Sequence, residues 1–331
     1  MAYVAIVGAA GYSGQETLDR VLRHPELELV ALGSDSLAGR PATALDPRLA
    51  CNGASASPGF VPNEEALASG ADVTFVCLGH EEAAGLDPRR SGVVVDLSGA
   101  HRLRSPELYD EWYGFTHPRA HELAGWSYAL PELLPPTGRL IANPGCYATA
   151  AILALRPIAD LVEPATVVVV DAKSGVSGAG RAPTPASHAG AVLDNLTAYR
   201  VGRHQHEPEI AQAIGFPVCL VPHLLPVRRG LIATCYARAD AVAVRERLEE
   251  TYADAPAVEV LAEGVDPELS RVQGTDGAEL TVFQDRATGT AIVVCAIDNL
   301  GKGAAGQAIQ NANLALGLEE TAGLRLSGVL V

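Results

Sequence analysis

The stretch Val4-Ala5-Ile6-Val7-Gly8-Ala9-Ala10-Gly11-Tyr12-Ser13-Gly14 decides the fold of the first part of the chain. Its four leading apolar residues predict a buried parallel strand, and glycines at three-residue intervals follow at once. A helix with apolar spacing comes next, and residues 28–32 form a second strand. This strand, glycine loop, helix and strand are typical of dinucleotide binding, because the glycines let the backbone approach a pyrophosphate at the helix N-terminus. The expected cofactor-binding residues here are Gly8, Gly11, Tyr12, Ser13 and Gly14.

The end of the second strand bears on which cofactor is bound. It reads Gly33-Ser34-Asp35-Ser36, with Arg40 beyond. An acid at this place binds the ribose hydroxyls of NAD, whereas serine and arginine suit the extra phosphate of NADP. Both kinds of residue are present, so Ser34, Ser36 and Arg40 are candidate contacts and the residues alone leave the cofactor open.

Two more strands, predicted at 72–78 and 93–97, lead to His80 and Ser98. Strand ends of this kind line the ligand crevice of an open α/β sheet, so either residue is a candidate cofactor neighbour or an ordinary loop residue. A short helix is expected over 81–90. Residues 41–63 look loop-rich, and 101–138 look like an irregular connector.

A second decisive stretch is Asn143-Pro144-Gly145-Cys146-Tyr147-Ala148-Thr149. A short apolar run precedes it, helix formers follow it, and Pro-Gly is a turn signal. Cys146 is therefore expected in the first turn of a helix, where unpaired N–H groups and the helix dipole favour a thiolate. The alternative is a small buried apolar cysteine.

The other cysteines have a different setting. None of the six forms a C-x-x-C pair, so neither a zinc site nor a redox pair is indicated. Cys51 lies in a polar stretch. The remaining four occupy apolar strand-like runs and are expected to be inert core residues: Cys77, Cys219, Cys235 and Cys295.

The second half of the chain predicts a mixture of strands and helices. Strands are expected at 166–171, 218–221, 231–236, 279–284 and 290–297, and a helix near 241–252. The loop Ser174-Gly175-Val176-Ser177-Gly178-Ala179-Gly180-Arg181 suits oxyanion or phosphate binding through its N–H groups, or is a flexible linker.

The segment Arg203-His204-Gln205-His206-Glu207-Pro208-Glu209 offers an acid/base. Glu207 is expected to cap a helix that starts at Pro208. Alternation points the two imidazoles to opposite sides, and we favour His204 as the proton donor and acceptor, with Glu209 orienting the ring and His206 binding substrate. No third ligand is spaced for a metal, and a solvated pair is the alternative.

Composition excludes whole classes of function. A net charge of −15 argues against nucleic acid or an anionic membrane as partner. No apolar stretch reaches the roughly 18 residues of a membrane span, and the start of the chain lacks the basic flank of a signal peptide. We expect a cytoplasmic globular protein with room for two domains.

Taken together, these motifs resemble those of the N-acetyl-γ-glutamyl-phosphate reductase family of arginine biosynthesis, which is related to aspartate-semialdehyde dehydrogenase. The specific parts are the Asn143–Thr149 stretch and the ending Asp298-Asn299-Leu300-Gly301-Lys302-Gly303-Ala304-Ala305-Gly306-Gln307. The resemblance implies an α/β fold with a Rossmann-type domain at 1–145 and 302–331. It implies an α+β catalytic and dimerisation domain at 146–301, NADP as cofactor, and a homodimer or homotetramer without a metal.

The resemblance also assigns residues. Cys146 matches the family nucleophile, and His204, His206 and Glu209 match the paired histidines and their acid. Gly178 and Asn299 are expected at the cofactor, and the substrate contacts are expected to be Glu132, Ser177, Arg181 and Lys302. The family pattern Asp-Leu-Ser-Ala-Asp-Phe-Arg-Leu is Asp96-Leu97-Ser98-Gly99-Ala100-His101-Arg102-Leu103 here, so one acid is missing.

The implied chemistry is reductive dephosphorylation of an acyl phosphate through a cysteine thioester, with the oxyanion held by helix-start N–H groups and Asn143. The same reaction on an acyl phosphate attached to an acidic carrier protein, as in lysine biosynthesis, is disfavoured by the negative charge of this chain. Aspartate-semialdehyde dehydrogenase is disfavoured by Tyr147 after the cysteine. A NADP-binding regulator that has lost the chemistry is disfavoured by the intact cysteine and histidines.

Overall fold

The computed structural model describes residues 1–47, 59–185 and 187–328. The chain forms two compact units: residues 1–144 with 304–324, and residues 145–303 with the end of the chain from Arg325. Cys51 lies outside the described residues. No helix in the described ranges is both long enough and apolar enough to cross a membrane.

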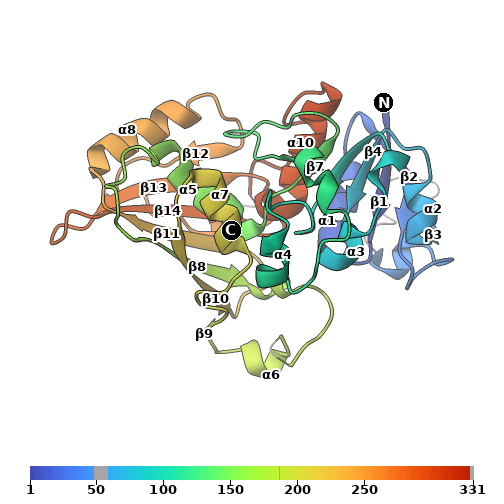
Figure 1. Ribbon diagram of the computed structural model, residues 1–331, viewed down its shortest axis with the longest axis horizontal. Coiled ribbons are helices and arrows are strands. Elements are labelled where there is room, and N and C mark those ends of the chain that lie inside the picture. Colours follow the sequence, from blue (N-terminus) through green and yellow to red (C-terminus); the bar gives the residue numbers. More distant parts are fainter. Residues whose placement is uncertain (48–58, 186, 329–331) are drawn as a thin grey trace. The chain divides into compact units, whose positions relative to one another are not determined.

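The first unit is built on a parallel sheet of seven strands in the order β3-β2-β1-β4-β5-β7-β6. This is the doubly wound arrangement that the opening motif predicted, and Figure 1 shows it in blue to green. The strands are β1 (Ala2–Val7), β2 (Leu27–Gly33), β3 (Phe60–Val61), β4 (Val73–Val76), β5 (Val93–Asp96), β6 (Ser127–Tyr128) and β7 (Leu140–Ala142).

Helices cover both faces of this sheet, which explains why its strands are apolar throughout. On one face α1 (Tyr12–Val21) and α10 (Gly306–Leu316) bury apolar side chains against β1, β4 and β5. The other face is covered by α2 (Asn63–Leu67), α3 (His80–Ala84) and the connector that follows β5. The return of the chain to this unit through α10 was expected from Lys302 to the end. In the structure it runs from 304 to 324, and Arg325 pairs with Asp276 of the second unit.

The second unit contains a mixed sheet in the order β12-β13-β14-β11-β8-β10-β9. Its strands are β8 (Val168–Gly175), β9 (Thr197–Ala198), β10 (Val218–Leu225), β11 (Leu231–Ala237), β12 (Val258–Val260), β13 (Ala278–Gln284) and β14 (Ala291–Ile297). Residues alternate between buried and half-buried along β8, β10 and β11, so one face is covered and the other is open.

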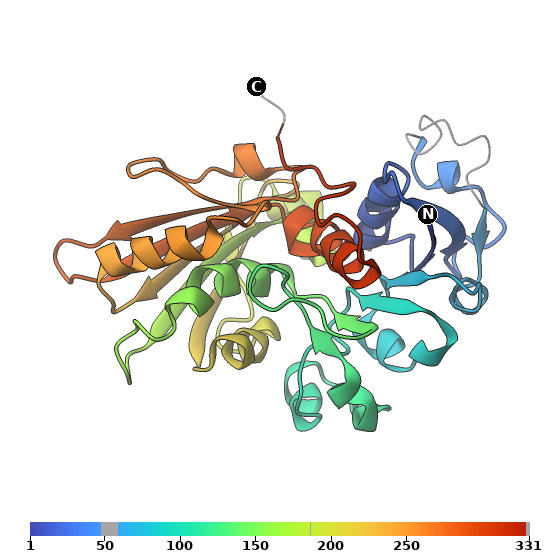
Figure 2. The ribbon, with the colours of Figure 1, turned by 90° about the horizontal axis from the view of Figure 1, so that it is seen from above.

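Helices α5 (Cys146–Leu155), α7 (His206–Ile214) and α8 (Ala241–Tyr252) pack on the covered face of this sheet, as Figure 2 shows from above. Helix α5 is almost wholly buried, which agrees with its unbroken run of small and apolar residues. The remaining helices are short: α6 (Ala189–Val192), α9 (Leu269–Val272) and a π-helical turn at Gly301–Ala305 before α10.

Three local expectations were wrong. The 101–138 connector is not irregular throughout, because it contains α4 (Glu107–Trp112) and a 3₁₀ segment at Ala120–Gly125. The helix expected over 81–90 ends at Ala84, before a separate 3₁₀ turn at Pro88–Arg90. Glu207 does not cap α7: that helix begins at His206, and the Glu207 carboxylate instead accepts a hydrogen bond from the Leu220 N–H.

Candidate active site

Cys146 is the first residue of α5, as the Pro-Gly turn predicted. Gly145 precedes it in extended conformation, and no side chain caps the helix. A helix start of this kind favours an anion. A Cβ atom on Gly303 would lie 2.8 Å from Cys146 Cβ, so the glycine of the Lys302-Gly303 pair leaves the space that the thiol occupies. Cys146 is half-buried and forms no disulfide.

A buried carboxylate joins the starts of α5 and α7. Glu209 has no exposed surface, and its Oε1 accepts a 2.8 Å hydrogen bond from the Gly145 N–H. Glu209 lies in the first turn of α7, three residues after His206. The bond therefore fixes the residue before the thiol relative to the helix that carries the histidine. This is a positional role, and the expected action of Glu209 on an imidazole stays a prediction.

The two histidines lie together, with ring centroids 4.7 Å apart, so the expectation that they point to opposite sides was wrong: His206 already begins α7, and the segment is not extended. The Tyr147 ring contacts both of them edge-on, at 5.4 Å from His204 and 5.9 Å from His206. The Tyr147 hydroxyl lies 3.0 Å from the Tyr199 hydroxyl and donates to the His223 carbonyl. One tyrosine, held at its far end, thus supports both imidazoles beside the helix start.

The surroundings of His204 argue against an acid/base role for it. Its Nδ1 accepts a hydrogen bond from the His206 backbone N–H at 3.2 Å, which leaves the proton of the neutral ring on Nε2. Burial, together with the nearby charges of His206 and Arg200, lowers the pKa of His204 to about 2. An imidazole that stays neutral with one nitrogen already engaged is suited to positioning its neighbour.

The glycine loop has the geometry that close approach to a phosphate requires. Gly8 has φ +79°, and a Cβ there would lie 2.6 Å from the Cys77 carbonyl oxygen. A Cβ on Gly14 would lie 2.5 Å from Ala9 Cα, so this glycine allows α1 to pack against the loop. Gly11 is the N-cap of α1 and brings no capping side chain. The glycines therefore allow the close packing typical of dinucleotide-binding loops, and their contacts with the cofactor stay a prediction.

Asp35 is held away from a ligand by its hydrogen bonds within the fold. Its two carboxylate oxygens accept hydrogen bonds from the backbone and side-chain nitrogens of Asn63, at 2.8 and 3.1 Å. The Asn63 side-chain oxygen in turn accepts from the Gly8 N–H. The neighbouring Ser34 and Ser36 hydroxyls lie 3.3 Å apart, and Arg40 is exposed beyond them. This arrangement favours a 2′-phosphate on the serines and arginine over a ribose diol on Asp35.

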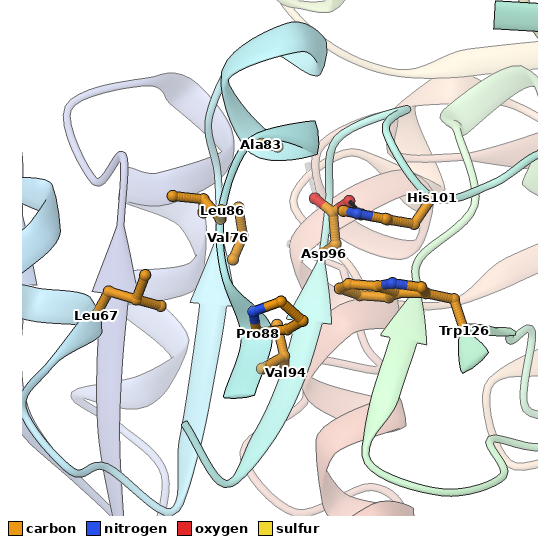
Figure 3. Close-up of a pocket in the computed structure, with 9 residues that line it drawn as sticks. All are labelled: Leu67, Val76, Ala83, Leu86, Pro88, Val94, Asp96, His101 and Trp126. Atoms are coloured by element: carbon orange, nitrogen blue, oxygen red, sulfur yellow. Dashed lines mark hydrogen bonds and ion pairs between the residues drawn. The ribbon is translucent and has the colours of Figure 1, made fainter. Parts of the chain in front are cut away.

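The end of β5 is organised by a buried pair, Asp96 and His101, drawn in Figure 3. His101 Nδ1 lies 2.7 Å from Asp96 Oδ2, and its ring stacks on Trp126 with centroids 3.7 Å apart. Burial acts to raise the pKa of Asp96, but hydrogen bonds from His101 and Ser98 outweigh it and lower that pKa below its usual value. A cavity of about 10 Å³, room for roughly one water, lies among these rings and apolar side chains.

Ser98 itself is turned inward. Its N–H and hydroxyl both donate to Asp96, and its hydroxyl accepts from the Ala100 N–H. Ser98 therefore shapes the loop through Asp96, and a direct cofactor contact by its side chain stays a prediction. His80 supports the same loop, because its Nδ1 accepts from the Gly99 N–H.

Several other predicted site residues are engaged in internal contacts. The Asn143 side chain is buried, donates to the Ala304 carbonyl and accepts from Asn311, so its contacts give no support to the oxyanion role. Glu132 accepts from Gln310. Asn299 donates to Ser177 and accepts from the Gly230 N–H, which ties the loop containing Gly178 to the sheet. Lys302 is fully buried and Arg181 is exposed.

Gln307, at the second position of α10, was not predicted from the sequence. It is completely buried, and neither its amide oxygen nor its amide nitrogen has a hydrogen-bond partner in the described structure. An unpartnered buried amide costs roughly 1–3 kcal/mol, so a group of this kind calls for an explanation. Only its place in the Gly-Ala-Ala-Gly-Gln ending could have indicated a role.

Three of the other described cysteines contrast with Cys146, whereas Cys219 is half-buried in β10. Burial raises the pKa of Cys77 and that of Cys235 to about 12, and raises the pKa of Cys295 well above its usual value. These thiols stay protonated and inert, as the apolar strands around them predicted. Within the ranges described, no three histidine, cysteine or acidic side chains gather in a way that would hold a metal ion.

Comparison with known proteins agrees with both halves of this description. Residues 3–139 match the semialdehyde dehydrogenase NAD binding domain, and residues 146–299 match the semialdehyde dehydrogenase dimerisation domain. In structure, the chain is similar to aspartate semialdehyde dehydrogenase II of Vibrio cholerae, with a TM-score of 0.73 and 21% identity over 96% of this chain and 98% of the other. At that identity the likeness shows the fold.

Sequence relatives are more specific. The chain is 44% identical to the N-acetyl-gamma-glutamyl-phosphate reductase of Acidothermus cellulolyticus, with 99% of both chains covered. It is 45% identical to the protein of that name from Salinispora arenicola and 40% identical to that from Pelotomaculum thermopropionicum, each over 98% of both chains. With a helix-start cysteine, paired histidines and a dinucleotide loop in place, the chain belongs to the N-acetyl-γ-glutamyl-phosphate reductase family.

Proposed function

We propose that the chain converts N-acetyl-γ-glutamyl phosphate to N-acetylglutamate 5-semialdehyde with NADPH, in arginine biosynthesis. The observation that carries this is Cys146 at an uncapped helix start beside two buried histidines, in a chain 40–45% identical to reductases of that name. Nothing among these relatives favours a carrier-bound substrate of lysine biosynthesis.

The nucleophilic step belongs to the second unit. Cys146 Sγ attacks the acyl carbon, the bond from carbon to the phosphate oxygen breaks, and phosphate leaves with the electron pair. His206 takes the thiol proton and returns it to the departing phosphate, because Nδ1 of His204 already accepts the His206 N–H and burial keeps the His204 ring neutral. The N–H groups at the start of α5 stabilise the oxyanion.

The residues of the first unit fit a nicotinamide dinucleotide. Gly8, Gly11 and the start of α1 would hold the pyrophosphate, and Ser34, Ser36 and Arg40 the 2′-phosphate. The unpartnered amide of Gln307 has the donor and acceptor that a carboxamide requires. When bound, NADPH supplies the hydride that reduces the thioester.

After reduction the carbon–sulfur bond breaks, Cys146 recovers its thiolate, and the aldehyde departs. The Glu209 bond to Gly145 holds the start of α7 against the start of α5 throughout, so that His206 keeps its position relative to Cys146. The substrate carboxylate and phosphate require cations. We keep Arg181 and Lys302 as proposals for these contacts, with Ser177 in the adjacent loop.

We also propose that the enzyme is cytoplasmic and forms a homodimer through its second unit. A reduced thiol nucleophile suits a reducing compartment. The matched dimerisation domain spans 146–299, and half-buried apolar residues such as Ile232, Tyr236 and Val294 line the open face of its sheet. A flat face of this composition is suited to a second copy.

The test is the reverse reaction, measured as phosphate-dependent NADP reduction by absorbance. N-acetylglutamate semialdehyde should exceed aspartate semialdehyde by at least about a hundredfold in kcat/KM. Equal efficiency with the two aldehydes would overturn the substrate assignment, and activity without phosphate would overturn the acyl-phosphate chemistry.

A further inference from the structure

Thr149 differs from the other threonines in the helices of this chain. Three threonines lie in α-helices of the described residues: Thr17 in α1, Thr149 in α5 and Thr251 in α8. The hydroxyls of Thr17 and Thr251 each donate to the carbonyl four residues before, at 2.8 and 2.7 Å. The Thr149 hydroxyl is buried and makes no hydrogen bond in the described structure, although its N–H donates to the Gly145 carbonyl. A buried hydroxyl normally has a partner, so this one requires an explanation.

The position of Thr149 in α5 places its side chain beside the nucleophile. Side chains of an α-helix lean towards its N-terminus, so each residue covers the positions three and four before it. For Thr149 these positions are Cys146 and the N-cap Gly145, which has no side chain. Residues three apart in a helix have Cβ atoms about 5–6 Å apart, so the hydroxyl and the thiol share one face of α5.

A thiolate at Cys146 would form close to an existing negative charge. Glu209 of α7 brings its carboxylate to the Gly145 N–H, one residue before the thiol. Two like charges so near each other are unfavourable unless donors stabilise the second one. A protonated thiol is only a weak acceptor, whereas hydrogen bonds to an ionised acceptor are strong. A hydroxyl that is unbonded beside the resting thiol is therefore suited to the thiolate.

The other titratable groups around the start of α5 come from the segments that pack against it. Burial keeps the His204 imidazole neutral and raises the pKa of the Tyr199 hydroxyl to about 12. Neither group therefore brings a charge of its own to the thiolate. The full set comprises Tyr147, Tyr199, His204, His206, Glu209 and Lys302.

We propose that the Thr149 hydroxyl donates a hydrogen bond to Cys146 Sγ once the thiol has lost its proton to His206. The bond is given up while sulfur carries the acyl group. It forms again when the carbon–sulfur bond of the reduced intermediate breaks and sulfur leaves with the electron pair. Thr149 is thus a catalytic residue that touches the reacting sulfur. The inference rests on the proposed thioester chemistry and adds a group that stabilises sulfur both as nucleophile and as leaving group.

Alkylation of Cys146 by iodoacetamide tests this bond without substrate or cofactor. Its rate from about pH 5 to 10 follows the thiolate, and mass spectrometry of the peptide that contains Cys146 separates it from the other cysteines. Thr149→Val removes the hydroxyl and should raise the midpoint of the profile by about one unit or more, because a bond to an ionised acceptor is lost. Thr149→Ser keeps the hydroxyl and should leave the midpoint within about 0.3 of the wild-type value.

Stability and turnover should move apart in Thr149→Val. Because the resting hydroxyl has no bond to lose, the variant should melt no lower than the wild type in circular dichroism, whereas kcat should fall about tenfold or more. Thr149→Ala also lacks the hydroxyl and should give the same midpoint if valine packs poorly. The matched control is Thr251→Val, which removes a hydroxyl bonded to the Arg247 carbonyl. It should melt lower, leave the midpoint in place and keep kcat within about twofold.

The outcomes separate this inference from the proposed function. A midpoint that does not move in Thr149→Val and Thr149→Ala overturns the role of Thr149, whatever happens to kcat, and leaves the nucleophile standing. Equal shifts in Thr149→Ser and Thr149→Val would show that the hydroxyl is not the cause and would also overturn it. A Cys146→Ser variant that keeps its turnover overturns the thioester chemistry and this inference with it.

Discussion

The buried carboxylate of Glu209 offers the sharpest test of how the site is held. Its replacement by alanine removes the acceptor of the Gly145 N–H, at a bond of 2.8 Å to a side chain with no exposed surface. A hydrogen bond to a charged group contributes about 1.5–3 kcal/mol, and an N–H left unsatisfied in the interior is part of that loss. We expect Glu209→Ala to lower the free energy of unfolding by about 2–3 kcal/mol.

Glu209→Gln is the matched control, because an amide oxygen can accept the same bond. Its free energy of unfolding should fall by less than about 1.5 kcal/mol, because the variant keeps a neutral hydrogen bond and forgoes only the contribution of the charge. The assay is urea unfolding followed by circular dichroism, with kcat measured on the same preparations. In the alanine variant kcat should fall more than KM rises, because the carboxylate positions His206 and Cys146 and does not bind substrate. Equal losses of stability in the two variants would refute the hydrogen bond as the cause.

Further expectations concern the nucleophile, the cofactor and pH. Cys146→Ser should lower turnover by about three orders of magnitude or more, while Cys235→Ser should change stability and leave the chemistry in place. Arg40→Ala should raise KM for NADPH and leave KM for NADH nearly unchanged, and a wild-type preference for NADH would contradict the interpretation of Asp35. His206→Asn should depress kcat strongly, and near-normal rates would remove it from the proton transfer. Folding lowers the pKa of His204, so as the pH falls the unfolded chain binds the proton first. The free energy of unfolding is therefore complete above about pH 6.5 and falls by up to about 2 kcal/mol by pH 5. His204→Asn should flatten that slope when unfolding is measured across pH.

Periodicity and turn chemistry were sufficient for much of the architecture. The apolar runs predicted the buried strands of both units, and the Pro-Gly turn placed Cys146 at the first residue of α5. These signals are local, since a strand buried on both faces must be apolar wherever it lies. The two-residue strands β3, β6 and β9 carry no such signal, because pairing with a neighbour defines them.

Which residue of the site has which role depends on contacts between residues that are distant in sequence, and no local pattern encodes these contacts. Alternation suggested that one histidine would face the thiol and favoured His204. It could not show that Nδ1 of His204 accepts a hydrogen bond from the His206 N–H. The hydrogen-bond chain from Asp35 through Asn63 to Gly8 spans 55 residues between its last two members. Gln307 was missed because an unpartnered amide can be recognised only when its surroundings are known.

The stacked pair at the end of β5 limits which residues this chain can carry at positions 100 and 101. Where the family pattern reads Asp-Phe, this chain has Ala100 and His101, and the imidazole is bonded to Asp96 while it keeps the flat contact with Trp126. Restoring phenylalanine alone would strip a buried carboxylate of its partner, and restoring aspartate alone would place a second acid at a fully buried position. The two reversions together would remove the partner of Asp96 and add the second acid, so either change, alone or combined, should be harmful in this chain.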